Sequence, residues 1–130
     1  MHRRSSLAAL LFVWFGACKG ASEPGRIACT ANVVPAIVVA VYDAQSGTPV
    51  ADSASGTVVD GAYSDSLRAY EWDPSMVLIA RAAAYERAGS YSLSIQRSGY
   101  QPWSASGIHV DRNECHVNTV VLRANMSRSP

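Results

Sequence analysis

Gly-Ser-Tyr-Ser-Leu-Ser-Ile-Gln, residues 89–96, alternates large apolar side chains with small polar ones along its whole length. Successive side chains of a β-strand point to opposite faces of the sheet. Tyr91, Leu93 and Ile95 would therefore share one face, while the serines and Gln96 share the other. The alternation predicts a strand with one face in a core and one face in water.

Six further segments carry β-type patterns, separated by turn residues at intervals of about ten residues. They are residues 33–41, 56–60, 66–72, 76–88, 103–110 and 115–122. Residues 80–87 are rich in Ala, Arg and Glu, which also favours a helix. We predict a strand there because residues 76–79 are apolar and Gly89 leads at once into the next strand. About seven short strands predict an all-β fold, an antiparallel β-sandwich.

The N-terminal segment resembles a bacterial lipoprotein signal. Arg3 and Arg4 precede an apolar run over residues 7–15, which Gly16-Ala17-Cys18 follows. As a helix, nine residues cover about 14 Å, less than half of a ~30 Å hydrocarbon core, so the run does not span a bilayer. Phe15 stands where the lipoprotein pattern prefers Leu, and plain secretion is the alternative. We predict cleavage before Cys18 and attachment of diacylglycerol and a palmitate-type acyl chain to that residue.

These features divide the chain into a signal peptide at 1–17, a flexible tether at 18–28, the sandwich at 29–125 and a frayed polar tail at 126–130. The prediction is an exported protein, lipid-anchored in the cell membrane or outer membrane. The residue after Cys18 is Lys19, whereas an Asp at this position would resemble an inner-membrane retention signal. The outer membrane is therefore the expected location.

Two further cysteines, Cys29 and Cys115, remain if Cys18 carries lipid, since the chain has three in total. Exported thiols pair, so we predict a disulfide that ties the two ends of the domain together. The alternative is a metal pair of these cysteines with His109 and His116. That alternative lacks any Cys-x-x-Cys spacing.

Length and charge exclude several classes of partner. The 130 residues suffice for one domain, and 48% of them are hydrophobic. Removal of residues 1–17 takes away Arg3 and Arg4 and leaves a chain of about −1 net charge. No basic stripe is present to neutralise phosphates, so nucleic acid is not an expected partner.

Three short motifs support a family resemblance. Residues 43–50 form an Asp-x-x-Ser-Gly-x-Pro-Val turn, residues 86–95 lead into a Gly-x-Tyr-x-Leu strand, and Ser98-Gly99-Tyr100 makes a turn. Together they resemble the carboxypeptidase regulatory-like domain, a small transthyretin-like (prealbumin-like) β-sandwich, over residues 30–125. The resemblance implies an accessory, stabilising or binding module without a catalytic set. The related hydroxyisourate hydrolases use a Tyr-Arg-Gly-Ser terminus that residues 127–130 do not match.

Acidic and aromatic side chains gather between residues 60 and 73. The candidate ligand-binding residues are Tyr63, Asp65, Tyr70, Trp72 and Asp73. Aromatic rings beside carboxylates would stack on a sugar or grip a cationic peptide, and the carboxylates would suit Ca²⁺. The alternative is that the rings belong to the core and the acids to solvated turns.

Histidines supply the acid–base candidates. His109 and His116 flank the last predicted turn, with Asp111 and Glu114 nearby. His109 falls out of phase with its apolar neighbours, which predicts a solvent-facing position. No nucleophile elbow, phosphate loop or His-Glu-x-x-His motif occurs. We predict a non-enzymatic protein without cofactor or bound metal, used for interaction or envelope structure.

Overall fold

The computed structural model describes residues 25, 27–70 and 79–130. The predicted signal peptide, Cys18, most of the tether, Trp72 and Asp73 lie outside the described residues. No helix in the described part is long and apolar enough to cross a bilayer.

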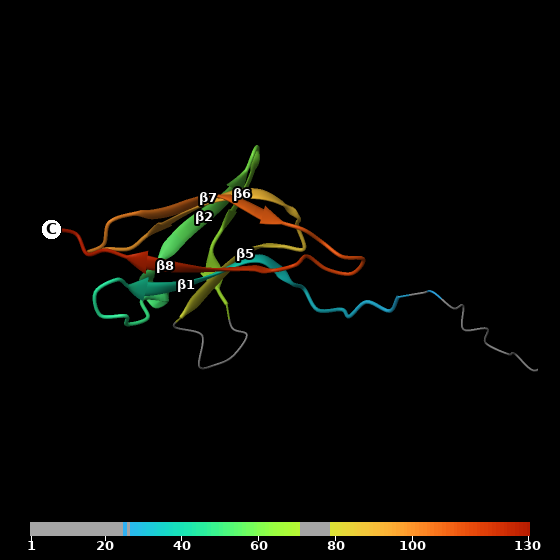
Figure 1. Ribbon diagram of the computed structural model, residues 1–130, viewed down its shortest axis with the longest axis horizontal. Coiled ribbons are helices and arrows are strands. Elements are labelled where there is room, and N and C mark those ends of the chain that lie inside the picture. The colour runs from blue at the N-terminus through green and yellow to red at the C-terminus, as the bar shows by residue number, and fades with distance from the viewer. Residues whose placement is uncertain (1–24, 26, 71–78) are drawn as a thin grey trace, which may run out of the picture.

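The chain forms two four-stranded sheets packed face to face (Figure 1), which confirms the predicted all-β sandwich. Sheet A contains, in spatial order, β4 (Arg68–Ala69), β5 (Ala80–Tyr85), β1 (Pro35–Asp43) and β8 (Val120–Met126). Sheet B contains β3 (Tyr63–Ser66), β2 (Ser55–Asp60), β6 (Gly89–Gln96) and β7 (Trp103–Val110). A 3-10 turn, η1 (Ala51–Ser53), connects β1 to β2.

The described residues form eight strands, where about seven were predicted. The single strand expected over residues 66–72 is wrong, because β3 belongs to sheet B and β4 to sheet A. Leu67 lies between them, packs against the core and donates its backbone N–H to the Gly56 carbonyl at 2.9 Å. This residue carries the chain from one sheet to the other. Residues 80–85 are a strand, as predicted for this ambiguous segment.

The closing strand begins later than predicted. Residues 113–116 instead form a turn in which the Asn113 side-chain oxygen accepts the N–H groups of Cys115 and His116 at 2.8 and 2.9 Å. β8 then runs parallel to β1, so the sandwich is not wholly antiparallel. Because β1 and β8 are far apart in sequence, no tight hairpin is needed between them.

The core lies between the two sheets, where the alternation of β6 predicted it. Tyr91, Leu93 and Ile95 are at most 1% exposed, and their intervening serines face water. They pack in the same cluster as Ile37 and Val39 of β1. Burial of these side chains stabilises the fold by roughly 1.5–3 kcal/mol each before the cost of ordering the chain.

Asp43 holds together the end of the sandwich at which β1 and β8 finish. Its side chain is 1% exposed, and its carboxylate accepts the N–H groups of Gln45 and Ser46, the Tyr100 hydroxyl and Arg128 Nε, at 2.7–2.8 Å. These donors, led by the Ser46 N–H, hold the pKa of Asp43 far below the usual range of an aspartate. The carboxylate thereby joins the β1 turn to two segments near the C-terminus.

The C-terminal tail is polar, as predicted, but the expectation that it frays is wrong. Gln101 N–H donates to the Ser127 carbonyl at 2.8 Å, and Ser129 N–H donates to the Gly99 carbonyl at 2.9 Å. Arg128 lies between these backbone bonds and reaches Asp43. The tail is therefore pinned to the turn that contains Tyr100.

The predicted disulfide joins Cys29 to Cys115, with the two Cα atoms 5.2 Å apart. It links the segment before β1 to the turn before β8, at the opposite end from Asp43 (Figure 1). Next to it, His116 Nδ1 lies 2.8 Å from Glu86 Oε1, and Thr30 Oγ1 lies 3.0 Å from His116 Nε2. The first described residues are thus held to the domain by both covalent and polar contacts.

Replacing both cysteines, as Cys29→Ser with Cys115→Ser, should lower the free energy of unfolding by about 4 kcal/mol. The closed loop spans 86 residues, and its loss enlarges the unfolded ensemble. Denaturant unfolding with circular dichroism measures the change. Wild-type protein treated with reductant should match the double variant, and an unchanged midpoint in both samples would contradict the expected role.

Asp43→Asn should lower the melting temperature at pH 7 by about 10 °C, because it removes the charge that Arg128 and three neutral donors face. Asp111→Asn, the same change on a side chain that is 73% exposed, should have little effect. The pKa of Asp43 is lower in the folded chain than in the unfolded chain. Its stabilisation is therefore complete well above an unfolded aspartate pKa of about 3.9 and is lost as the pH falls below it. The difference between the wild type and Asp43→Asn should shrink below about pH 4, and a constant difference down to pH 2 would refute this role.

Candidate functional site

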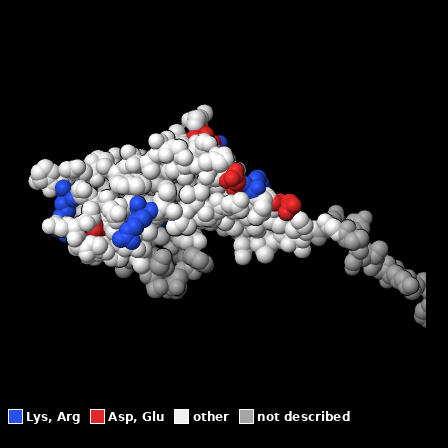
Figure 2. Space-filling model, viewed as in Figure 1, with Lys and Arg blue, Asp and Glu red and all other residues white. Residues whose placement is uncertain are grey.

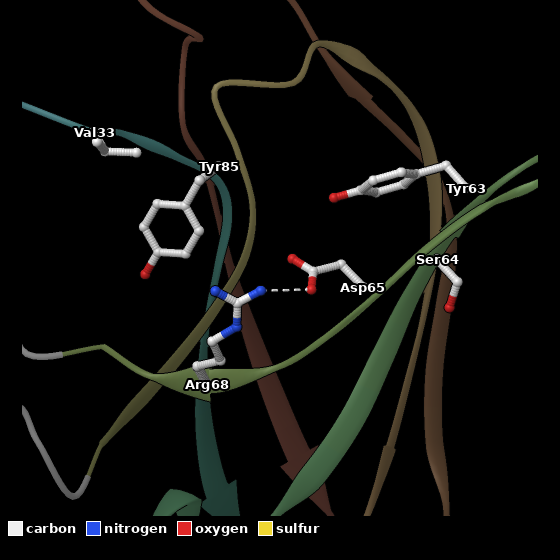
Figure 3. A pocket seen from close by; sticks show the side chains of 6 residues that line it. All are labelled: Val33, Tyr63, Ser64, Asp65, Arg68 and Tyr85. Atoms are coloured by element: carbon white, nitrogen blue, oxygen red, sulfur yellow. Dashed lines mark hydrogen bonds and ion pairs between the residues drawn. The ribbon is translucent and has the colours of Figure 1, made fainter.

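A groove opens where the edges of the two sheets meet beside the start of β1 (Figure 3). Its first part has a volume of about 440 Å³ and is lined by Val33, Tyr63, Ser64, Asp65, Arg68 and Tyr85. A second part of about 560 Å³ shares Val33 and Tyr85 and continues past Pro35 to Tyr70. We call the two parts together the tyrosine groove.

Tyr63 forms one wall of the tyrosine groove from β3. Its hydroxyl points into the groove (Figure 3), while the Arg87 guanidinium carbon lies 4.0 Å from its ring centroid. The Tyr91 ring meets it edge-on, with the centroids 6.3 Å apart. Burial raises the pKa of the Tyr63 hydroxyl. One ring face is thus taken by Arg87, which leaves the hydroxyl as the group that Tyr63 presents to a ligand.

Asp65 closes the floor of the groove, and both of its carboxylate oxygens are engaged. Oδ2 accepts the Ala84 N–H at 2.9 Å, and Oδ1 accepts Arg68 Nη2 at 2.8 Å. Burial alone would raise the pKa of Asp65, but these two donors hold it below the ordinary aspartate value. Ala84 has a φ of +57°, a strained conformation for a residue with a Cβ, and the bond from Asp65 supports it. Asp65 therefore links sheet B to sheet A.

Arg68 and Tyr85 form the opposite wall. The Arg68 side chain is 63% exposed, and its guanidinium carbon lies 5.9 Å from the Tyr85 ring centroid. A guanidinium has five N–H donors. Burial raises the pKa of Tyr85. Val33 stands beside this wall and is 65% exposed, which gives the groove an apolar rim.

The structure brings three of the five predicted ligand-binding residues into one place. Tyr63, Asp65 and Tyr70 line the tyrosine groove, whereas Trp72 and Asp73 lie outside the described residues. The Asp65 carboxylate, which was predicted to bind a ligand or Ca²⁺, already accepts hydrogen bonds from Arg68 and Ala84. No group of three or more metal-ligating side chains occurs within the described ranges.

The sequence prediction missed several groove residues, and three of them have large side chains that form its walls and rim. Val33, Arg68 and Tyr85 come from a segment before β1, from β4 and from the end of β5. Only the pairing of β4 with β5, and of β5 with β1, brings them together. Nothing in the sequence indicated that Val33 is exposed, because residues 33–41 were predicted to form one strand.

The two candidate histidines, His109 and His116, make polar contacts outside the tyrosine groove. His109 is solvent-facing, as predicted, and lies 3.1 Å from Ser90 Oγ and 2.9 Å from Asp111 Oδ1. His116 contacts Glu86 and Thr30. Hydrogen bonds from the Val34 N–H and from His116 lower the pKa of Glu86. Because Cys29 and Cys115 are bonded to each other, the alternative of a metal site with the histidines is excluded.

The sequence matches no protein-family model and no curated protein.

Proposed function

We propose that the protein is a non-enzymatic lipoprotein, anchored through Cys18, whose β-sandwich serves interaction or envelope structure. The observation that carries the proposal is the disulfide. Cys29 and Cys115 are bonded to each other, so Cys18 is the one remaining cysteine of the three in the sequence. Cys18 directly follows two arginines, an apolar run and two small residues, which is the order of a lipoprotein signal.

Export and anchoring are mutually consistent. A disulfide favours an oxidising compartment outside the cytoplasm. About nine tether residues after Cys18 would give a reach of about 17 Å. The sandwich would then stay close to the outer face of the cell membrane or to the outer membrane.

The proposed family is the carboxypeptidase regulatory-like domain, a transthyretin-like sandwich. Its motifs have structural roles in this chain that support the proposal. Asp43 of the Asp-x-x-Ser-Gly turn binds Tyr100 of the Gly-Tyr turn through a 2.7 Å hydrogen bond, and Tyr91 of the Gly-x-Tyr strand is in the core. An accessory module of this kind needs no catalytic residues.

Intact mass of the protein extracted from native membranes tests the anchor. We expect the mass of residues 18–130 with a diacylglyceryl group and an acyl chain, less two hydrogens for the disulfide. A Cys18→Ser variant should stay unmodified. An unlipidated chain in the soluble extracellular or periplasmic fraction would instead support plain secretion and refute anchoring.

A second candidate function is binding at the tyrosine groove, and the convergence of Tyr63, Arg68 and Tyr85 favours it. Of the two ligand classes, carbohydrate and peptide, the contacts favour a short extended peptide. Arg87 covers a face of the Tyr63 ring that would otherwise stack on a sugar. Tyrosine hydroxyls and the Arg68 guanidinium suit backbone carbonyls, and Val33 suits an apolar side chain.

Selection of phage-displayed random peptides on the immobilised wild-type protein tests the groove. Phage that bind an Arg68→Ala, Tyr85→Ala double variant are removed first, and the remaining phage are selected on the wild type. The peptides recovered should bind the wild type at least tenfold more tightly than the double variant. His109→Ala, on another surface, should leave binding unchanged. Equal affinity for all three proteins would rule the groove out as the binding site.

A further inference from the structure

The outer side of sheet B carries a regular array of small hydroxyl side chains. Because the inner positions of its strands fill the core, the alternate positions face water. We define the hydroxyl face by Thr57, Ser66, Ser92, Ser94, Ser104 and Ser106. The five serines are exposed and Thr57 is half-buried.

The strand register aligns four of these residues in one row across the whole sheet. Ser66 of β3 is opposite Thr57 of β2, Thr57 is opposite Ser94 of β6, and Ser94 is opposite Ser104 of β7. Adjacent strands are about 4.8 Å apart, and alternate residues along a strand are separated by about 7 Å. Hydroxyl groups therefore recur at short intervals in two directions.

The hydroxyl face is shallowly hollowed. A depression of about 300 Å³ crosses β2, β6 and β7, and five of the six hydroxyl residues line it together with Val59. The Val59 side chain is 41% exposed and is the large apolar side chain of this surface. A ligand there would meet many hydroxyl groups and one apolar contact.

The hydroxyl face carries no charge in the strands of sheet B, which the structure describes completely. Their two acidic residues point toward the inner side, where Asp60 pairs with Arg87 at 2.6 Å and Asp65 binds Ala84 and Arg68. His109 is the one titratable side chain on the outer side, at the far end of β7 opposite Ser90. Figure 2 views the sandwich from its side, and the charged side chains visible there lie mainly toward the two ends of the molecule.

This chemistry identifies the class of ligand. A charged polymer would give up water at the hydroxyl face without meeting an opposite charge. Serine is depleted in protein–protein interfaces, which argues against a protein partner. Serine and threonine hydroxyls both donate and accept hydrogen bonds, as sugar hydroxyls do.

We propose that the hydroxyl face binds an uncharged polysaccharide chain. The chain lies in the depression across β2, β6 and β7, with sugar hydroxyls on the serines and a C–H face on Val59. Single contacts of this kind are weak, and repetition along the polymer and along the surface supplies the retention. The site is separate from the tyrosine groove and does not depend on the anchor.

Sedimentation with insoluble polysaccharide tests the proposal. The full chain, purified in mild detergent, is mixed with insoluble cellulose or chitin, and the bound fraction is measured. A Thr57→Val, Ser94→Ala, Ser104→Ala variant removes three of the four aligned hydroxyls and should retain less than a fifth of the binding. A matched variant, Ser53→Ala, Ser98→Ala, Ser129→Ala, removes three exposed hydroxyls elsewhere and should bind as the wild type does.

Ser104→Lys gives a second, independent variant, since it places a long charged side chain on edge strand β7 and leaves the other hydroxyls in place. It should also lose binding, and circular dichroism shows whether each variant is folded. The proposal is overturned if the wild type sediments with neither neutral polymer. Equal binding of all folded variants overturns it as well, and so does retention on heparin or chitosan in preference to both neutral polymers.

Discussion

Three inward-facing carboxylates govern how this sandwich closes. Asp43, Asp60 and Asp65 occupy core-side positions near strand ends, where an unpaired charge would be costly. Each forms an ion pair with an arginine: Arg128, Arg87 and Arg68 respectively. Asp43 also accepts backbone N–H groups from the turn after β1, and Asp65 accepts the N–H of Ala84 in β5.

These pairs connect segments that the sheets alone would leave apart. Asp43 fixes the C-terminal tail and the Tyr100 turn, and Asp60 places the Arg87 guanidinium against Tyr63. Asp65 joins β3 to the strained end of β5. Asp60 and Asp65 therefore help to shape the tyrosine groove, and both carboxylates are already paired with arginines. The predicted aromatic and acidic patch thus becomes a groove of tyrosine hydroxyls and one exposed arginine.

The sequence was sufficient for the core strand, which depends on local periodicity, and for the disulfide, which depends on cysteine parity. The alternation at Tyr91, Leu93 and Ile95 located a core strand, and the parity of the cysteines located the disulfide. It was insufficient where one residue changes sheets. Leu67 looks like any apolar strand residue, and only its hydrogen bond to Gly56 and its packing reveal the crossing between β3 and β4.

The groove could be predicted only in part for the same reason. Tyr63, Asp65 and Tyr70 are neighbours in sequence, so composition pointed to them. Tyr85 and Val33 reach the groove through strand pairing, which no local pattern encodes. The tail was also misjudged, because the partner of Arg128 is a carboxylate 85 residues earlier.

The two ends of the sandwich are closed by different means. The disulfide and the Thr30–His116–Glu86 contacts hold the N-terminal end, while Asp43 holds the opposite end (Figure 1). Neither set of contacts involves the outer side of sheet B. The outer side of sheet B is a flank of the sandwich, between its two ends. A tether at the N-terminal end would therefore leave this side uncovered. Because the carboxylates of sheet B point inward and pair there, the side chains on its outer side are mainly hydroxyls, with Val59 and His109 among them. Such hydroxyls can exchange hydrogen bonds with the hydroxyls of the proposed polysaccharide.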